Sequence, residues 1–263
     1  IAANVSSITA EAHPKFAAGS PQERRQIIVP PTLFCGPLLA RLFRRSSGPP
    51  TIGRRRIEAF FSGTARNGHF RQAFARWADE RMRARAPGLL VGPPPPRGPA
   101  ERAIEWIRTK LPPWLPLPAL HGHLQFGDYM GEATFCLAPR GFASWSARMY
   151  EALFAACVPV VLSDGWSPPF RRLLHWDRLV VRVAEGHLGE LEGAMRRVPT
   201  ATVRAMQERL PYTRLPLCAD GLGEEQTAAP GRPKAAAAGA GTHHPFAQWL
   251  LLELHAVHQR RGR

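Results

Sequence analysis

Residues 133–164, ATFCLAPRGFASWSARMYEALFAACVPVVLSD, decide the fold of this chain. Thr134–Ala138 and Val158–Ser163 are apolar runs of strand length, and the segment that begins near Ser146 has the spacing of a helix. The stretch therefore predicts a βαβ unit in which a Pro-Arg-Gly turn joins the first strand to the helix. Open α/β sheets bind phosphate-bearing ligands where a strand's carboxyl end meets a helix's amino end. The residues at this junction are therefore the candidate site.

The polar residues at the junction suit an anionic ligand. Ser146 is placed to cap the helix, whose amino end carries partial positive charge, and Arg148 adds a full charge beside it. The planar fork of Arg148 can donate two hydrogen bonds to a diphosphate, and Gly141 lets the backbone approach a ligand closely. One turn further, the Glu151 carboxylate can accept hydrogen bonds from both hydroxyls of a ribose. The spacing equally allows a plain i,i+3 ion pair between Arg148 and Glu151.

An upstream segment has the same order of features. Ile57–Ser62 alternates in polarity and predicts a strand, Gly63 follows it, and apolar residues at i, i+4 and i+7 from Phe70 predict a helix. Backbone N–H groups at such a turn can meet a phosphate, although most turns of this kind only reverse the chain. On pattern alone, Arg71 is interpreted as a solvated helix residue rather than a ligand contact.

The rest of the chain predicts alternating strands and helices around the βαβ unit. Because the later strands are continuous apolar runs, we expect an α/β fold with a doubly wound, Rossmann-like parallel sheet covered on both faces. Residues 56–218 form the expected domain, residues 219–242 are a low-complexity, mobile segment, and residues 243–263 are a C-terminal helix. Residues 1–25 are interpreted as a polar tail. Further strands are expected at Gln26–Val29, Leu89–Val91 and Leu179–Val183, and further helices at Ala100–Leu111, Phe126–Glu132, 187–197, 200–210 and Pro245–Arg261.

The bulk composition narrows the function classes. The net charge is +15, but the arginines are scattered and no nucleic-acid motif occurs, so nucleic-acid binding is disfavoured. An anionic ligand, an anionic substrate or a membrane surface is compatible with the charge. No window approaches the roughly 18 apolar residues of a membrane span. His121 and His123 have no third residue at metal-ligand spacing, so no metal site is predicted.

The four cysteines show neither a CxxC motif nor metal-ligand spacing. Cys136 and Cys157 lie inside apolar runs and are interpreted as buried free thiols. A disulfide is the alternative in an oxidising compartment, but the sequence alone does not assign a pairing.

The order of these motifs resembles the exostosin-type glycosyltransferase family. That family's pattern runs from Phe-Cys-Leu through a Pro-x-Gly turn to Ser-x-Arg and Glu-Ala, and then to Cys-Ile/Val-Pro-Val and Pro-Phe. Upstream, IIVPP and FFSGTARNGHFR, which ends at Arg71, also resemble family segments. Ala156 stands where the family often has glycine. The matching residues, in chain order, are FCLAPRG (135–141), Ser146, Arg148, Glu151, ACVPVVLSD (156–164) and PPF (168–170).

The resemblance implies a glycosyltransferase with two Rossmann-like domains (GT-B), of which this chain holds the carboxyl-terminal, donor-binding half. Residues 1–55 are then a tail and the remnant of the amino-terminal acceptor domain. The implied donor is a nucleotide sugar, usually a UDP-sugar, with Arg148 on the diphosphate and Glu151 on the ribose. The other residues that the resemblance places at the nucleotide sugar are Arg140, Gly141, Ser146, Gly63 and Arg71.

The implied reaction is transfer of the sugar, with inversion, to a hydroxyl of a glycan or glycoprotein. The implied location is the Golgi lumen, as part of a type II membrane protein whose anchor lies upstream of this chain. No residue is assigned as the catalytic base, no metal ligand is named, and use of a divalent metal is left open. The alternative hypothesis is a non-catalytic module that keeps the fold and binds a ligand or partner.

Overall fold

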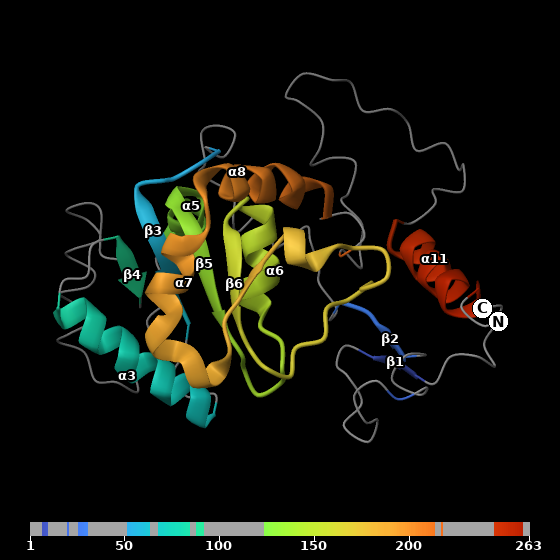
Figure 1. Cartoon of the computed structure of the whole chain (residues 1–263), viewed down its shortest axis with the longest axis horizontal. Helices are drawn as coiled ribbons and strands as arrows, with labels where there is room; N and C mark the ends of the chain where they lie inside the picture. Colours follow the sequence, from blue (N-terminus) through green and yellow to red (C-terminus); the bar gives the residue numbers. More distant parts are fainter. Residues whose placement is uncertain are drawn as a thin grey trace.

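A parallel sheet of five strands forms the centre of the computed structural model, in the order β4-β3-β5-β6-β7 (Figure 1). The structure describes residues 7–9, 20, 26–30, 52–63, 68–84, 88–91, 124–213, 217 and 245–259. The α/β fold with a parallel sheet is therefore confirmed. The strands are β3 (Ile57–Phe61), β4 (Leu89–Val91), β5 (Ala133–Pro139), β6 (Val158–Leu162) and β7 (Val181–Arg182).

Helices cover both faces of this sheet (Figure 1). On one face, Phe135 and Leu137 of β5 pack with buried side chains of α3, α7 and α8. On the other, Cys136 packs with side chains of α5 and α6. The alternation along β5 thus serves two apolar layers, as the continuous apolar run predicts. The helices are α3 (His69–Arg83), α5 (Leu124–Glu132), α6 (Ala147–Phe154), α7 (Leu191–Arg197) and α8 (Thr200–Arg209), with 3₁₀ turns η2 (Trp176–Arg178), η3 (Glu185–Glu190) and η4 (Leu210–Thr213).

The strand order places a topological switch point between β3 and β5. From β3 the chain continues through α3 to β4 on one side, and β5 pairs with β3 on its other side. Ligands of open α/β sheets bind at such a point, outside the carboxyl ends of the strands. We call the side of the sheet where strands end the carboxyl edge, and the side where they begin the amino edge.

Arg55 closes the amino edge. Its guanidinium donates to the carbonyls of Met130, Ala133, Ala155 and Ala156 at 2.7–3.3 Å, and its backbone N–H donates to the Thr134 hydroxyl at 2.8 Å. These carbonyls belong to the carboxyl ends of α5 and α6 and the start of β5, and helix ends are where backbone carbonyls need partners from outside the helix. Burial lowers the pKa of Arg55 to about 10, so the side chain is a cation at neutral pH.

Cys136 and Cys157 form a disulfide beside this clamp, with Cα atoms 5.7 Å apart. The interpretation of these residues as free thiols is therefore wrong, although both are buried as expected. The pairing follows from strand register: Cys136 lies opposite Pro159 in β6, and Cys157 comes just before that strand. Cys35 and Cys218 lie outside the described residues.

Ala156, in the turn between α6 and β6, has φ +47°. The N–H groups of Ala156 and Cys157 donate back to Leu153 and Ala152, which ends the helix in a left-handed turn. The left-handed conformation costs a non-glycine residue about 1–2 kcal/mol, so alanine is strained at this position, where the family often has glycine.

Two segments near the ends of the chain contact the core at Phe170 and Arg172. β1 (Ser7–Thr9) pairs in parallel with β2 (Gln26–Ile28), so part of the expected polar tail is a strand. Phe170 donates its N–H to Ile28 at 2.9 Å, and its ring contacts Trp249 of α11 (Pro245–Gln259). Arg172 and Glu253 form a buried ion pair at 2.5 Å between the core and α11. The C-terminal helix therefore docks on the core.

Other expectations need correction or lie outside the described residues. The expected buried strand at 179–183 is only the two-residue, half-exposed β7, because Leu179 and Val180 are folded inward by the preceding η2 turn. The expected helix at 187–197 begins as the 3₁₀ turn η3. The expected helix at 100–111, the two histidines at 121 and 123 and the segment 219–242 fall outside the description. Within the described residues, no helix is long and apolar enough to cross a membrane.

Candidate functional site

The amino end of α6 is capped as the sequence predicts. Ser146 has extended backbone angles, and its hydroxyl accepts a hydrogen bond from the N–H of Arg148 at 3.4 Å. The helix therefore begins at the carboxyl edge, a few residues after the end of β5. Its positive end faces the loop in which a ligand phosphate was expected.

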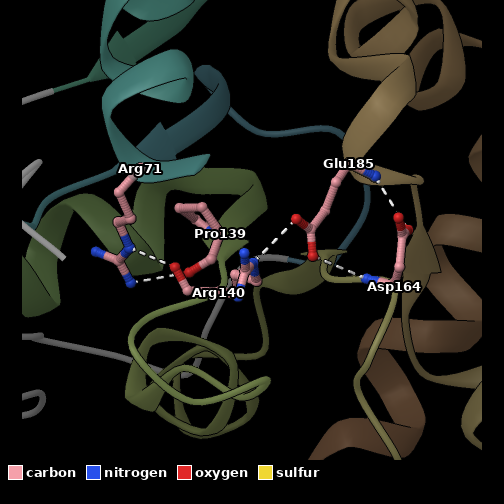
Figure 2. Close-up of polar contacts among 5 residues, drawn as sticks. All are labelled: Arg71, Pro139, Arg140, Asp164 and Glu185. Carbon is pink, nitrogen blue, oxygen red and sulfur yellow. Dashed lines mark hydrogen bonds and ion pairs between the residues drawn. The ribbon is translucent and has the colours of Figure 1, made fainter. Parts of the chain in front are cut away.

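Arg71 joins the two sides of the switch point (Figure 2). From α3, its guanidinium donates to the carbonyls of Pro139 and Arg140, each at 2.8 Å, and to the Ser146 hydroxyl at 3.2 Å. Its face lies over the Phe61 ring. Only 6% of Arg71 is exposed, so its interpretation as a solvated residue is wrong. Pattern alone hides this role, because the acceptor carbonyls are almost 70 residues away in sequence.

A second cation lies near Arg71. Burial first, and then the positive charge of Arg148, lower the pKa of Arg71 to about 10. Both guanidinium groups are therefore cationic at neutral pH and repel each other. Two arginines held close together beside a helix amino end form a favourable environment for an anion.

Arg148 also forms an ion pair with Glu151, one turn along α6. The Glu151 side chain is only 4% exposed, whereas the Arg148 side chain is 27% exposed. The i,i+3 ion pair that the spacing allows is therefore present. It does not exclude a ligand, because a guanidinium has five N–H donors and can serve a carboxylate and a phosphate together.

The two glycines of the predicted site are explained differently. A Cβ on Gly63 would approach Phe61 Cζ at 2.7 Å and Arg71 Nη1 at 3.2 Å, so the close packing around Arg71 requires glycine there. A Cβ on Gly141 would meet only the Trp145 carbonyl at 3.6 Å, an ordinary contact. The described protein residues therefore leave room for a side chain at Gly141.

Arg140 leads to two acidic residues that the sequence analysis did not select (Figure 2). Its Nε donates to Glu185 Oε2 at 2.9 Å. Glu185 Oε1 accepts the N–H of Asp164 at 3.2 Å, and Asp164 Oδ1 accepts the N–H of Glu185 at 3.0 Å. Asp164 and Glu185 follow β6 and β7 at their carboxyl ends. Their position after predicted strands was a usable signal, because carboxyl ends of parallel strands meet at one edge.

The structure thus brings most of the predicted residues into one connected set. Arg71 bonds to the Arg140 carbonyl and the Ser146 hydroxyl, Ser146 caps the helix that carries Arg148 and Glu151, and Gly63 packs against Arg71. Gly141 adjoins Arg140 in the same loop. Among the described residues, no group of three or more His, Cys, Asp or Glu side chains could hold a metal ion.

Comparison with known proteins shows which family this connected set of residues belongs to. The model of the exostosin GT47 domain matches residues 15–198, more than half of the chain and a range that includes the whole set. The chain belongs to the exostosin GT47 family. This is a family of glycosyltransferases, as the resemblance of the motifs predicted.

Two plant members and one animal member show how much of a GT47 protein is present. Over 109 residues the chain is 33% identical to the probable glucuronosyltransferase GUT1 of Oryza sativa subsp. japonica and 34% identical to the probable beta-1,4-xylosyltransferase IRX10 of Arabidopsis thaliana. Each match covers 41% of this chain and 26% of the relative. Over 87 residues it is 36% identical to exostosin-1 of Bos taurus, covering 33% of this chain and 12% of that protein. The matched part therefore spans about a quarter or less of these relatives.

Proposed function

We propose that this chain is the donor-binding half of a GT-B glycosyltransferase and that it holds a UDP-sugar at the carboxyl edge of its sheet. The observation that carries the proposal is that Arg71 and Arg148 lie together at the amino end of α6, with Arg140 in the adjoining loop, at the switch point between β3 and β5. Switch points bind nucleotides in open α/β sheets, and the family uses sugar donors.

The diphosphate is assigned to Arg148 and the amino end of α6. Arg148 is the more exposed partner of its ion pair, so its guanidinium can reach a ligand. Burial is the main cause of the lowered pKa of Arg71, and repulsion by Arg148 adds to it; the repulsion is relieved when a dianion lies beside both guanidinium groups. Arg71 then stabilises the loop beside the phosphates, because its donors are already bonded to the Pro139 and Arg140 carbonyls.

Glu151 is assigned to the ribose, and Arg140, Gly141 and Ser146 are assigned to the loop around the phosphates. A buried carboxylate can accept both ribose hydroxyls while it keeps its bond to Arg148. Since the described residues leave room at Gly141, the missing side chain is explained by a ligand that passes over the backbone.

The reaction we propose is a single displacement with inversion. A hydroxyl of a glycan or glycoprotein attacks the anomeric carbon from the face opposite the diphosphate, the bond to UDP breaks, and the hydroxyl proton passes to a base that we do not assign. The arginines stabilise the negative charge that develops on the departing UDP. The two plant relatives are named as a probable glucuronosyltransferase and a probable beta-1,4-xylosyltransferase, so UDP-glucuronic acid and UDP-xylose are the donors to test first.

We place the protein in the Golgi lumen, in a type II membrane protein. The Cys136–Cys157 disulfide supports an oxidising compartment, because such bonds persist in the secretory pathway and are rare in the cytosol. The family context points the same way.

Calorimetric titration with UDP tests the assignment. We expect the wild-type chain to bind UDP, and we expect Arg148→Ala and Glu151→Ala each to lower the affinity at least about tenfold. Arg56→Ala is the matched control, because Arg56 also pairs with a carboxylate, Glu132, but lies beside the amino edge. Repeating the titration with Mn²⁺ and with EDTA tests for a metal contribution. Absence of UDP binding to the wild type would overturn the proposal, and UDP binding without sugar transfer would favour the non-catalytic alternative.

A further inference from the structure

Glu185 is held in one orientation by its neighbour across the sheet edge. Its Oε1 accepts the Asp164 N–H, and the Asp164 carboxylate accepts the Glu185 N–H in return (Figure 2). These two hydrogen bonds tie the loop after β6 to the loop after β7. The second oxygen of Glu185 is left to face Arg140, whose Nε lies 2.9 Å away.

Arg140 is fixed at three points but keeps most of its donors. Its backbone N–H donates to the Leu162 carbonyl at 3.1 Å, and its carbonyl accepts from the Arg71 guanidinium at 2.8 Å. Its side-chain Nε donates to the Glu185 carboxylate. Within the part of the chain that the structure describes, neither terminal nitrogen of Arg140 has a protein acceptor, and 38% of the side chain is exposed. A guanidinium held at Nε presents its outer N–H groups as a rigid fork, which suits a phosphate.

The ion pair itself contributes little to folding. Both side chains reach solvent, with 38% of Arg140 and 21% of Glu185 exposed, and pairs of this kind are weak in stability measurements. The value of the contact lies instead in orientation, because a donor that is already aimed loses less freedom when a ligand binds.

We propose that Glu185 is a positioning residue for the sugar donor: braced by Asp164, it aims the terminal nitrogens of Arg140 at the phosphates of a nucleoside diphosphate. This inference rests on the proposed function, and it adds Glu185 and Asp164, which touch no ligand themselves, to the residues that set donor affinity. Helix α3 and the three loops after β5, β6 and β7 then act as one hydrogen-bonded support, from Arg71 through Arg140 and Glu185 to Asp164.

A double-mutant cycle on the 263-residue chain tests this role, with UDP and uridine as calorimetric probes. We expect Glu185→Ala to weaken UDP binding about tenfold and Arg140→Ala to weaken it at least as much. The double variant should bind UDP no more weakly than Arg140→Ala alone, because Glu185 acts only through Arg140. Uridine, which has no phosphate, should bind all variants equally.

Two further variants separate orientation from charge and folding. Arg140→Lys keeps the charge but has no Nε–H, so its UDP affinity should be the same with Glu or Ala at position 185. Glu185→Gln retains a single acceptor oxygen and should lose less affinity than Glu185→Ala, which keeps the test usable if the alanine variant does not fold. Glu132→Ala, at the opposite edge of the sheet, is the control and should leave UDP binding unchanged.

The outcomes distinguish this inference from the proposed function. If the wild-type chain does not bind UDP, both are overturned. If it binds UDP but Glu185→Ala has wild-type affinity, or the losses at Arg140 and Glu185 simply add, only the positioning role is overturned. An equal loss of uridine affinity would likewise overturn it, because the effect would then be structural.

Discussion

Arg55 and Arg71 show what distinguishes the two edges of the sheet. Both are buried arginines that donate to backbone carbonyls, and burial lowers the pKa of both to about 10. The pKa of Arg55 is lowered by burial alone, whereas that of Arg71 is also lowered by Arg148. Arg55 donates hydrogen bonds to carbonyls at two helix ends and one strand start, beside a disulfide, and so holds these elements together. Arg71 is one of several cations at the carboxyl edge, where the terminal N–H groups of Arg140 can still donate to a ligand.

A buried arginine is therefore not by itself evidence of a ligand site. What separates the carboxyl edge is the surplus of positive charge and of N–H donors, together with the amino end of α6 and the switch point. Variants at the amino edge should therefore change the free energy of unfolding and leave ligand affinity alone. Variants of Arg140, Gly141 and Arg148 at the carboxyl edge should do the reverse.

The largest effect is expected from the disulfide. The bond between Cys136 and Cys157 closes a loop with a sequence separation of 21, for which chain entropy predicts about 3 kcal/mol of stabilisation. Replacing both cysteines by alanine should lower the free energy of unfolding in urea by this amount. Dithiothreitol should then lower the stability of the wild type and not of the variant. Equal stability of the two proteins under oxidising conditions would contradict the assignment.

The next largest effect on the free energy of unfolding is expected at Arg55. Arg55→Met keeps the apolar stem but leaves four carbonyls without their charged donor, so we expect a loss of about 2–3 kcal/mol in the free energy of unfolding. UDP affinity, measured by calorimetry below the unfolding transition, should stay at the wild-type value. A fall in affinity without a fall in stability would break the distinction between the edges.

Gly141→Ala is the converse test at the carboxyl edge. The new Cβ meets only an ordinary contact with the Trp145 carbonyl, so the free energy of unfolding should change by less than about 1 kcal/mol. UDP affinity should fall about tenfold if the ligand passes over this backbone. Gly63→Ala serves as the contrast, because its Cβ would collide with Phe61 and should cost stability. Unchanged UDP binding in Gly141→Ala would remove this residue from the site.

The smallest effect is expected at Ala156. Because this residue has φ +47°, Ala156→Gly should relieve the strain of about 1–2 kcal/mol, part of which is offset by the greater freedom of glycine in the unfolded chain. The free energy of unfolding should therefore rise by about 0.5–1 kcal/mol, with no effect on UDP affinity. Thermal unfolding of the two proteins measures the difference. A lower melting temperature for the glycine variant would show that the turn is not strained.

How much the sequence predicted depended on the range of the interactions. The βαβ unit around α6 was predicted nearly to the residue, because its strands are continuous apolar runs and Ser146 is a strong helix cap. β1 was missed, since three residues carry no periodicity. The expected strand at 179–183 was too long, because apolar Leu179 and Val180 are buried by a turn rather than by the sheet.

The site was predicted in its residue types but not in its connections. Arg148 and Glu151 could be linked from spacing, because they lie one turn apart on one helix. The buried state of Arg71 and the disulfide depend on strand register and on contacts between distant loops, which no local pattern encodes. The Arg140–Glu185 contact was missed for the same reason, as 45 residues separate the pair.

A crystal structure of this chain with UDP tests the central claim most directly. We expect diphosphate oxygens within about 3 Å of the Arg148 guanidinium, because charge-assisted hydrogen bonds have this length, and ribose hydroxyls at the Glu151 carboxylate. We also expect the terminal nitrogens of Arg140 to reach a phosphate while its Nε stays bonded to Glu185. UDP bound at another place, with Arg148 and Glu151 unchanged, would overturn the proposed donor site.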